Sequence, residues 1–470
     1  MLSSSTARLA PLDVAPDEPM FAALRTREFA RLDAQGLAYL DYAATALYGA
    51  SQLRTHHALL ADAVLGNPHS ESGPSRASSA VIDRARRQVL AWFDVDESTH
   101  DVCFTANASA AIKLVAESYP FGPAAGLVLS ADNHNSINGV REYARRAGAP
   151  VRVLPLGPGL RLDDADAHLA SHARAGRGLV ALPAQSNFSG VRHPLALVGR
   201  ARSLGFDVLL DVAAFSASHP LSLAACPADF AVLSFHKLFG YPTSVGALIA
   251  RRDALARLRR PWFAGGTVQF VSVGADTHRL QRGHEGFEDG TGDFLGIASL
   301  APGFALLGEV GLARLSAHVA RLTAYVIDAL AALRHPCGAP LVRIYGPCGP
   351  RAMDARGATV AFNVCDPRGE VIAYPTVEAR ARAAGVALRG GCFCNPGAAE
   401  AAFGLTPDGL AACLAATGDE FSVARLAACM GRAVGAVRLS LGLANHRADI
   451  DRAIAVVASF AERAAGAATR

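Results

Sequence analysis

Two cysteines one residue apart lie among glycines in the segment LRGGCFCNPGAAE, residues 388–400. A thiolate that is mobile, partly exposed and of lowered pKa is a good nucleophile, and flanking glycines supply backbone freedom. Zinc binding and a disulfide are the alternatives. A Cys-x-Cys pair provides only two ligands of a tetrahedral zinc site, no second Cys or His pair has suitable spacing, and a disulfide at this separation is strained. We therefore expect no metal, but the spacing alone does not decide whether these thiols are reactive.

An aspartate and a lysine each follow an apolar, strand-like run. FDVLLDVA contains Asp211, and DFAVLSFHKLFG contains Ser234, His236 and Lys237. Residues just past the carboxyl ends of parallel strands converge on one crevice. A lysine there could contact a phosphate or form an imine, and pyridoxal phosphate combines such a lysine with a carboxylate on its ring nitrogen. A simple ion pair at the sheet edge is the alternative.

Polar residues follow three further strand candidates. FTANASAAIKLV predicts a helix that opens at Ser109, and free amides at a helix start can hold a phosphate. SADNHNSINGV places His134 where its ring could lie over a flat cofactor, and PAQSNFSGV places Asn187 where its amide could donate to a ring oxygen. Each residue alone could be an ordinary loop residue. Together these strand ends favour a cofactor site.

Apolar runs alternate with helix-like stretches through the first part of the chain. The strand candidates are residues 101–106, 126–131, 151–156, 178–184, 207–213, 230–235 and 245–250, with helices such as 78–93 and 109–119 between them. This alternation predicts a mostly parallel sheet covered on both faces. A long helical stretch, 296–333, precedes a second α/β pattern with strands at 358–364, 386–391 and 436–442 and helices at 376–385 and 449–465.

The length of 470 residues suits one large and one smaller domain. We expect an N-terminal arm over residues 1–25, a large domain over 26–300 and a small domain with the cysteine loop over 301–470. A net charge of +4 without a basic block does not favour nucleic acid as a partner. The first 20 residues lack the apolar core of a signal peptide, and no window has the apolar length expected of a membrane span. The nine scattered cysteines, most of them expected to be buried apolar residues, do not resemble a secreted disulfide framework. We expect a cytoplasmic protein with no membrane partner.

An ordered series of segments between Tyr39 and Phe460 resembles the class V aminotransferase family. The segments include YLDYAATALY, GNPHSESG, FTANASAAIKLVAES, PAQSNFSGVRHPL, LSFHKLFGYPTSVGALIARRDA, FAGGTVQF, FEDGTGDFL, LRGGCFCNPGA and GAVRLSLGLANHRADID. Within the family, the chain is most similar to the cysteine-desulfurase domain of molybdenum cofactor sulfurases. An ordered set is far more specific than any single motif. The resemblance implies a fold-type I pyridoxal phosphate enzyme, α/β in class, with a large domain around a mainly parallel seven-stranded sheet, a smaller C-terminal α/β domain, and a homodimeric assembly.

The resemblance also implies the residues of the cofactor site. Lys237 would hold the cofactor as an imine and act as general base and acid, Asp211 would pair with the pyridine nitrogen, and His134 would stack on the ring and assist proton transfer. Asn187 would bond the ring hydroxyl. The phosphate would be surrounded by Ser109, Ala108, Ser234 and His236, and Thr267 would reach the phosphate of the partner subunit.

The remaining implied residues act on the substrate. Arg438 would clamp its carboxylate, with Arg389 as a second candidate. Cys394, the last residue of an Arg-x-x-x-x-Cys pattern, would be the nucleophile, with Cys392 in reserve. The chain differs from the family pattern at Ala214, where many desulfurases have glutamine, and at Gly390, where threonine is commoner and whose glycine could loosen the cysteine loop.

The expected function is a cysteine desulfurase that converts L-cysteine to L-alanine and a protein persulfide for transfer to an acceptor. Another reaction on the same cofactor, such as transamination, racemisation or β-elimination, is one alternative, because fold and cofactor do not fix the reaction. A non-catalytic sulfur carrier or scaffold is another. The sulfur-accepting C-terminal domain of full-length eukaryotic sulfurases is expected to lie outside this chain, so the acceptor, a protein or a small molecule, stays open, as does selenocysteine use.

Overall fold

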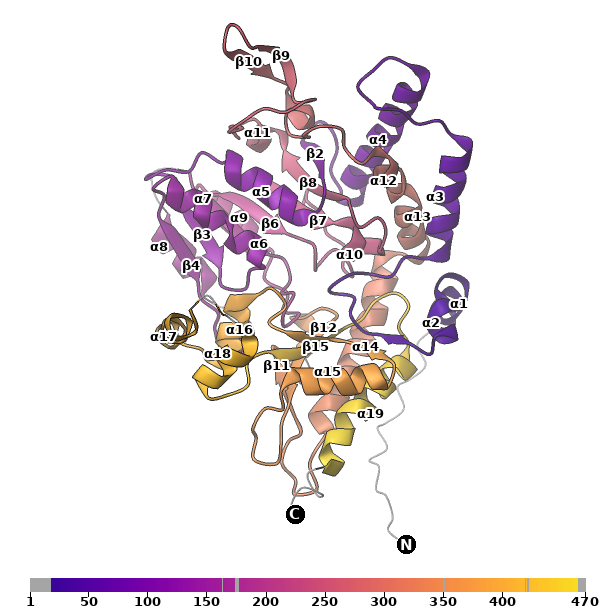
Figure 1. Cartoon of the computed structure of the whole chain (residues 1–470), viewed down its shortest axis with the longest axis vertical. Helices are drawn as coiled ribbons and strands as arrows, with labels where there is room; N and C mark the ends of the chain where they lie inside the picture. The colour runs from indigo at the N-terminus through magenta and orange to yellow at the C-terminus, as the bar shows by residue number, and fades with distance from the viewer. Residues whose placement is uncertain are drawn as a thin grey trace.

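The computed structural model describes residues 18–463, except 163, 174–176, 350, 419 and 421. A large sheet occupies one part of the molecule and a smaller sheet the other (Figure 1). The large sheet has seven strands in the order β2-β8-β7-β6-β5-β3-β4. These are β2 (His100–Thr105), β3 (Leu127–Ser130), β4 (Val151–Leu154), β5 (Leu179–Pro183), β6 (Asp207–Asp211), β7 (Phe230–Ser234) and β8 (Gly246–Arg251). Strand β8 runs antiparallel to β2 and β7, and the other pairs are parallel. The predicted mainly parallel seven-stranded sheet is confirmed.

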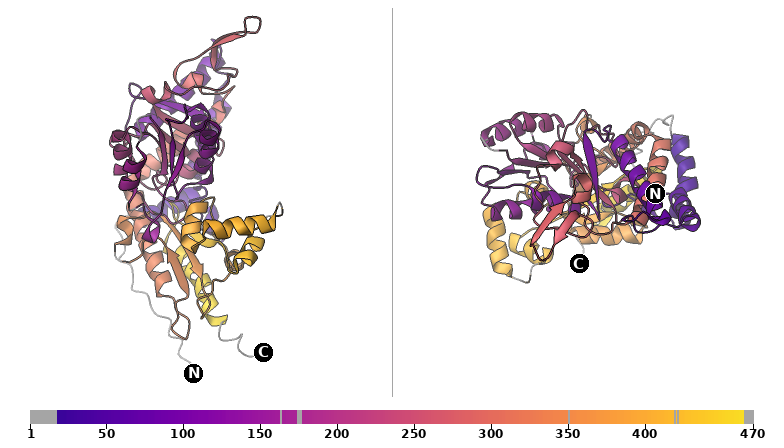
Figure 2. Two further views of the ribbon diagram at one scale, coloured as in Figure 1. Left: turned by 90° about the vertical axis from the view of Figure 1, so that its left-hand side faces the viewer. Right: turned by 90° about the horizontal axis from the view of Figure 1, so that it is seen from above.

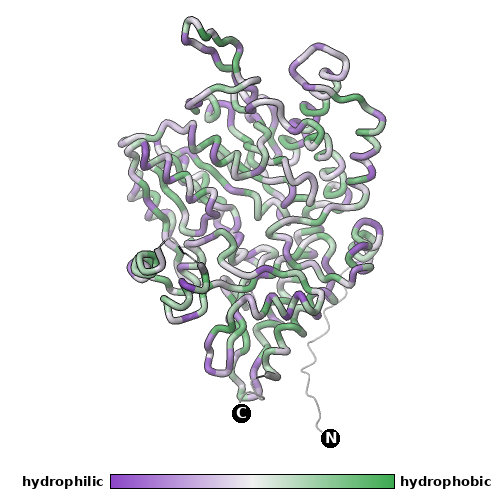
Figure 3. Tube along the Cα trace, in the orientation of Figure 1, coloured by the Kyte–Doolittle hydropathy of each residue, from purple (hydrophilic) through white to green (hydrophobic). Residues whose placement is uncertain are grey.

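Alternate residues of these strands enter two separate apolar clusters, because successive side chains of a strand point to opposite faces. Leu127 and Leu129 of β3 belong to one cluster, and Val128 belongs to the other. Helices cover both faces, as the side view in Figure 2 shows, and apolar segments run through the middle of the molecule in Figure 3. One face carries α5 (Ala108–Ser118), α6 (Asn135–Asn138), α7 (Val140–Arg146) and α11 (Arg252–Leu255); the other carries α4 (Gly73–Trp92), α8 (Ala165–His172), α9 (Ala196–Ser203) and α10 (Phe235–Phe239).

The helical stretch expected over residues 296–333 is three helices. They are α12 (Phe294–Ala298), α13 (Leu300–Val310) and α14 (Leu312–Ala332). Gly311 separates the last two with a φ of +79°, a left-handed conformation that favours glycine. No single helix among the described residues could cross a membrane by length and hydropathy; one pair, Phe294–Val310 and Leu312–Ala332, meets these criteria together but is bent by 69°.

The smaller sheet is antiparallel, with four strands in the order β11-β12-β15-β14. Its strands are β11 (Val342–Tyr345), β12 (Thr359–Val364), β15 (Ala436–Ser440) and β14 (Arg389–Gly391). Helices α14 and α15 (Tyr374–Ala383) pack against it, α19 (Arg447–Arg463) packs against these two helices, and α16 (Pro396–Phe403) follows the cysteine loop. The strand expected over 386–391 is split, since β13 (Val386–Ala387) pairs with β1 (Ala38–Tyr39) and only β14 joins the sheet.

The N-terminal segment contributes to the core from residue 18 onward. Residues 18–25, expected to be part of an N-terminal arm, belong to helix α1 (Glu18–Phe29). They are not an arm, because the apolar Phe21 and Leu24 are buried and Arg25 donates to Asp449 of α19 at 2.7 Å. Residues 1–17 lie outside the described part of the chain. Helix α2 (Arg31–Ala34) and α3 (Ala50–Asp62) complete this segment.

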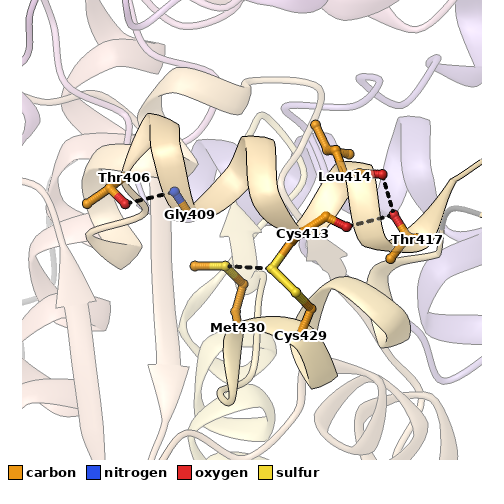
Figure 4. Close-up of a disulfide and its surroundings, with 7 residues drawn as sticks. All are labelled: Thr406, Gly409, Cys413, Leu414, Thr417, Cys429 and Met430. Carbon is orange, nitrogen blue, oxygen red and sulfur yellow. Dashed lines mark hydrogen bonds between the residues drawn. A yellow bond between two sulfur atoms is a disulfide. The ribbon is translucent and has the colours of Figure 1, made fainter.

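A helical hairpin of α17 (Pro407–Thr417) and α18 (Val423–Met430) projects from the smaller sheet (Figure 2). A disulfide between Cys413 and Cys429 joins the two helices (Figure 4). The prediction that most cysteines are simple buried residues is wrong, since only Cys103, Cys226 and Cys365 are buried free thiols. The disulfide was not predicted, because two cysteines sixteen positions apart meet only when the helices fold back on each other. Cys392 and Cys394 are both free thiols.

Candidate active site

Lys237 lies directly after the carboxyl end of β7, in the short helix α10. The helix ends at Gly240, whose φ is +81° and whose Cβ, if present, would collide with the backbone of Leu47 and Tyr48. Burial lowers the pKa of the Lys237 amine; the charge of Arg438 lowers it further, while Asp211 and Cys394 oppose the shift. The fold therefore brings these four residues, from separate parts of the sequence, close enough to influence one another.

Asp211 is the last residue of β6, the neighbour of β7 in the sheet. It is half-buried, and its Oδ1 accepts a hydrogen bond from the Ala213 amide at 3.0 Å. Asp211 and Lys237 thus lie at or just past the carboxyl ends of neighbouring parallel strands, the edge of an open sheet where ligands bind.

The N-terminus of α5 lies beside the end of β7. Asn107 caps this helix by accepting from the Ala110 amide at 3.0 Å, and the Ala108 amide donates to Ser234 Oγ at 2.8 Å. Gly246 of β8 permits the contact, because a Cβ there would lie 2.5 Å from the Asn107 backbone. Ser109 is exposed and its Oγ lies 2.6 Å from Ser136 Oγ. The start of α5 thus lies at the strand ends, in the kind of position where a helix N-terminus can bind an anion.

His236, next to Lys237, has a buried Nδ1 without a hydrogen-bond partner. Burial and the neighbouring Lys237 charge lower the pKa of its imidazole. A buried ring nitrogen without a partner is costly unless a ligand or water satisfies it. This atom therefore marks a position where a ligand would gain a hydrogen bond.

His134 caps the start of α6, where its Nδ1 accepts from the Ser136 amide at 3.1 Å. Burial lowers the pKa of the ring; the charges of Lys237 and Arg438 add to this and Asp211 opposes it. The imidazole is accordingly neutral near pH 7, with its proton on Nε2.

Arg389 and Arg438 are directly paired across β14 and β15. Asp41, which follows β1, lies between them: Arg389 Nη2 donates to it at 2.8 Å and Arg438 Nη2 at 3.3 Å. The hydrogen bonds from Arg389 to Asp41 raise the pKa of its guanidinium. Sequence reasoning missed Asp41 as a site residue, although it stands in the YLDYAATALY segment that carries the family resemblance.

Arg438 is only 3% exposed. Its Nη1 donates to the Asn187 carbonyl at 2.8 Å, and its guanidinium lies 4.6 Å from the centre of the Phe393 ring. Its Nε is buried without a partner. Burial lowers the pKa of this guanidinium, which Asp41 counteracts. A guanidinium with an unused donor can bind a carboxylate.

The two cysteines of the loop have different surroundings. Cys394 is exposed, whereas Cys392 is partly buried among apolar residues and has its pKa raised by burial. A thiol of raised pKa is a poor nucleophile at neutral pH. Of the two, Cys394 has the environment that suits a reactive thiol.

The loop is held in place at both sides of Cys394. The Asn135 amide donates to the Cys394 carbonyl at 2.7 Å, and Asn187 Nδ2 donates to the Phe393 carbonyl at 2.7 Å. Phe393 and Cys394 both adopt left-handed φ values, +54° and +56°. The loop is thus docked in this structure, in a conformation that non-glycine residues rarely adopt.

Gly390 is explained by its neighbours in this chain. A Cβ at this position would collide with the ring of Tyr374, and the Gly390 amide donates to Glu378 Oε1 at 2.6 Å. The Tyr374 ring thus takes the space in which a residue with a side chain would need to fit. The idea that this glycine loosens the loop finds no support in these contacts.

Thr267 lies apart from the residues just described. It precedes β9 (Val268–Ser272), which forms with β10 (Thr277–Leu280) the hairpin at the top of Figure 1. It is fully buried, and its hydroxyl both donates to the Ala264 carbonyl and accepts from the Ala264 amide at 2.9 Å. Within the described residues, no group of three or more His, Cys, Asp or Glu side chains could hold a metal.

Comparison with known proteins places these observations in context. The model of the family described as Aminotransferase class-V matches residues 38–453. The chain is 36% identical to a molybdenum cofactor sulfurase of Arabidopsis thaliana, covering 95% of this chain and 59% of the relative, and 34% identical to that of Homo sapiens, covering 91% and 50%. The chain therefore spans about half to three-fifths of the length of these relatives.

Solved structures share the fold. An apo cysteine desulfurase from Thermococcus onnurineus matches with a TM-score of 0.77 and 21% identity, covering 97% of this chain and 100% of that one. A cysteine desulfurase from Escherichia coli matches with a TM-score of 0.73 and 24% identity, covering 95% and 98%. The expected fold, a large domain on a mainly parallel sheet with a smaller α/β domain, is confirmed.

Proposed function

Because the chain belongs to the aminotransferase class-V family, we propose that it is a pyridoxal phosphate-dependent cysteine desulfurase. It would convert L-cysteine to L-alanine and retain the sulfur as a persulfide on Cys394. The single observation that carries this proposal is the convergence of Lys237, Asp211, Arg438 and Cys394 on one site, at the ends of β6 and β7 and beside Asn187, which contacts both Arg438 and the cysteine loop. The activities named for the similar sulfurases and desulfurases support it.

The residues of the site fit pyridoxal phosphate. Lys237 would bind its aldehyde carbon, and Asp211 would face its ring nitrogen. The start of α5, Ser234 and the unpartnered Nδ1 of His236 would receive its phosphate. When bound, this cofactor supplies an electron sink for charge that develops on the substrate.

The asparagine expected at the ring hydroxyl has a second role. Asn187 donates one amide hydrogen to the Phe393 carbonyl and accepts from Asn395 Nδ2 at 2.9 Å. One hydrogen of Nδ2 stays available for a ring oxygen. Asn187 would therefore hold the cysteine loop and the cofactor together.

The substrate carboxylate would bind Arg438, through its unused Nε, and the half-exposed Arg389. Lys237 suits proton transfer at the substrate, because burial and Arg438 lower its amine pKa and so increase the neutral, basic form near pH 7. The neutral His134 ring can relay a proton through Nε2.

Sulfur transfer requires the Cys394 thiolate to attack the sulfur of L-cysteine. A new sulfur–sulfur bond forms, the bond between the substrate sulfur and its β-carbon breaks, and that carbon takes a proton to give L-alanine. The reaction needs no external oxidant, since the carbon is reduced while the two sulfurs become a persulfide. Cys394 suits the attack because it is exposed and lies near the positive charge of Arg438.

A pair of cysteine variants tests the proposal. The protein should release alanine from L-cysteine and, with a thiol reductant, sulfide. Cys394→Ser should abolish both while retaining the cofactor absorbance, and Cys392→Ser, one residue from it in the same loop, should keep most of the activity. Full alanine formation by Cys394→Ser would contradict the persulfide mechanism and favour another reaction on the same cofactor, such as transamination, racemisation or β-elimination. Absence of cofactor absorbance and unchanged behaviour of Lys237→Ala would favour a non-catalytic sulfur carrier.

We also propose a homodimer with the active site at the subunit interface. The β9–β10 hairpin exposes Phe270, Val271 and Val273, which are 59%, 43% and 95% accessible. Apolar side chains exposed together are typical of interaction sites. Thr267 lies at the base of this hairpin, so a partner bound there would approach Thr267. The sulfur acceptor is proposed to be a protein or small molecule that reaches the exposed Cys394.

A further inference from the structure

A buried carboxylate outside the proposed chemistry lies behind the cysteine loop. Asp132 follows β3 and is fully buried. Its Oδ2 lies 2.8 Å from His193 Nε2, and its Oδ1 accepts from Ser186 Oγ at 2.8 Å and from Asn395 Nδ2 at 2.6 Å. A buried carboxylate is stable only when such donors surround it.

Asn395 connects Asp132 to Cys394, because it is the next residue in the chain. Its side chain is fully buried: Nδ2 donates to Asp132 and to Asn187 Oδ1, and Oδ1 accepts from the Ala398 amide at the start of α16. At Gly397 a Cβ would collide with the Ala131 carbonyl, so the first turn of α16 lies directly against the segment that carries Asp132.

The docked loop is opposed by its own backbone. Two successive non-glycine residues, Phe393 and Cys394, have left-handed φ values that are unfavourable without compensating contacts. The hydrogen bond to a buried charge is among the stronger contacts available to hold such a segment. Release of the loop would also leave Asp132 buried with one donor fewer, which adds to the cost of undocking.

We propose that Asp132 is a positioning residue for sulfur transfer, which through Asn395 fixes Cys394 beside Lys237 and Arg438. The inference rests on the proposed function, in which Cys394 is the nucleophile. It adds that the buried hydrogen bond from Asn395 to Asp132 holds the Cys394 thiol in position, so the thiol is not carried by a freely mobile glycine loop. Asp132 is not among the residues assigned to substrate or cofactor, and its direct contact with the cysteine loop is through Asn395.

Two conservative variants test the anchor from its two ends. Asp132→Asn keeps the shape of the side chain and removes its charge. The Nδ1 atom of His193 has no partner and can carry the proton of the imidazole, so that Nε2 of His193 can accept a hydrogen bond from the amide of the new asparagine. Asn395→Ser removes the donor to Asp132 but keeps an oxygen that can cap α16. Each should lower alanine formation about 10- to 100-fold, the loss expected when a reacting group is misplaced by about an ångström. Cofactor absorbance and its change on adding L-cysteine should persist.

Hydrogen exchange provides a readout that does not depend on turnover. The Asn135 amide, which donates to the Cys394 carbonyl, should exchange about tenfold faster or more in both variants, since undocking exposes it. The double variant should be no worse than the more impaired single variant, because both remove one shared interaction. The proposal would be overturned if the losses of activity in the two single variants added up in the double variant, or if hydrogen exchange at the Asn135 amide were unchanged. It would also be overturned if the variants lost cofactor in proportion to their loss of activity. If Cys394→Ser retains full activity, the proposed function itself fails; if Cys394→Ser is inactive and both anchor variants are normal, only the positioning role fails.

Discussion

At Asp41, one carboxylate binds two guanidinium groups that face the same site. Arg389 is half-exposed and Arg438 is buried, yet both reach this side chain, which is 12% exposed. Two like charges paired across neighbouring strands repel each other, and a shared carboxylate offsets this repulsion. Asp41 thereby sets the positions in which the two arginines meet a substrate carboxylate.

Asp41→Asn should raise the KM for L-cysteine about tenfold with a smaller effect on kcat, because charge-assisted hydrogen bonds contribute about 1.5–3 kcal/mol. Steady-state alanine formation measures both constants. Asp33→Asn, which removes the charge of another aspartate bonded to an arginine, Arg25, is the matched control and should leave KM unchanged. An equal effect of the two substitutions, or a loss confined to kcat, would argue against this role for Asp41.

Lys237 permits a test of its lowered pKa, because the sequence contains only one other lysine, Lys113. In a Lys113→Arg background, the apo protein should form an imine with pyridoxal phosphate at a rate that rises with pH and levels off below 10.5, the ordinary lysine value. The sign follows from burial, which favours the neutral, reactive amine at lower pH. The rate is measured from the absorbance of the imine at a series of pH values. The Lys237→Arg variant gives the background reaction at the N-terminal α-amine, which is subtracted. An increase of about tenfold per pH unit that continues up to 10.5 would contradict the lowered pKa.

At the scale of elements, the site depends on how closely a helix start approaches a strand end. Helix α5 can bring its first turn to β7 only because β8 has a glycine at its first residue, Gly246. Elsewhere, the α17–α18 hairpin packs its small apolar cluster against Cys392, and its disulfide joins the two helices behind that thiol. The contact of α5 with β7 and the contact of the α17–α18 hairpin with Cys392 both join elements that are not adjacent in the chain.

Gly246→Ala should weaken the binding of pyridoxal phosphate about tenfold, because the new Cβ would push the start of α5 away, and the interaction of an anion with a helix start contributes up to about 2 kcal/mol. Equilibrium titration of the apo protein measures the dissociation constant. Gly199→Ala is the control, since Gly199 lies on the exposed face of α9 with no atom within 4 Å of its added Cβ. This control should bind the cofactor normally and unfold at the same or a slightly higher temperature. Normal binding by Gly246→Ala would show that the close approach of α5 is not needed.

At the scale of the whole molecule, the site forms where the two sheets meet. The large sheet supplies Lys237 and Asp211, the small sheet supplies Arg438, and Asp41 comes from the N-terminal segment. A fully buried arginine, Arg356, ties the two parts together by donating to the Ser189 carbonyl at 2.6 Å and the Thr359 carbonyl at 2.8 Å. Burial lowers the pKa of Arg356 to about 10.

The proposed homodimer is tested at its exposed hairpin. Replacing Phe270 and Val273 by aspartate should convert a dimer to a monomer, since charges at a desolvated apolar contact are strongly unfavourable. Sedimentation velocity gives the assembly state, and cofactor binding should weaken in parallel if Thr267 reaches the phosphate of the partner subunit. Leu414→Asp, a charge at an exposed apolar residue of α17 far from the hairpin, should leave the dimer intact. A monomeric parent protein, or a dimeric hairpin variant, would exclude this interface.

The sequence by itself determined the parallel sheet, its strands and the positions of Lys237 and Asp211. Apolar runs and strand-end polar residues are local signals, and parallel strands bring their carboxyl ends together whatever the details of packing. The sequence also indicated the cysteine loop, because two cysteines among glycines can be recognised without knowledge of the fold. The break of the 296–333 stretch into three helices was not predicted, since the composition on both sides of Gly311 is equally helical.

Only the tertiary structure decided which groups touch. The Asp41 clamp, the Asp132–Asn395 contact and the Cys413–Cys429 disulfide join residues whose partners are set by packing between elements, and no spacing in the sequence encodes those distances. The same packing distinguished the two loop thiols, because burial of Cys392 and exposure of Cys394 depend on helices that follow them in the chain. Residue type and local pattern thus fixed the chemistry available, and long-range packing fixed its geometry.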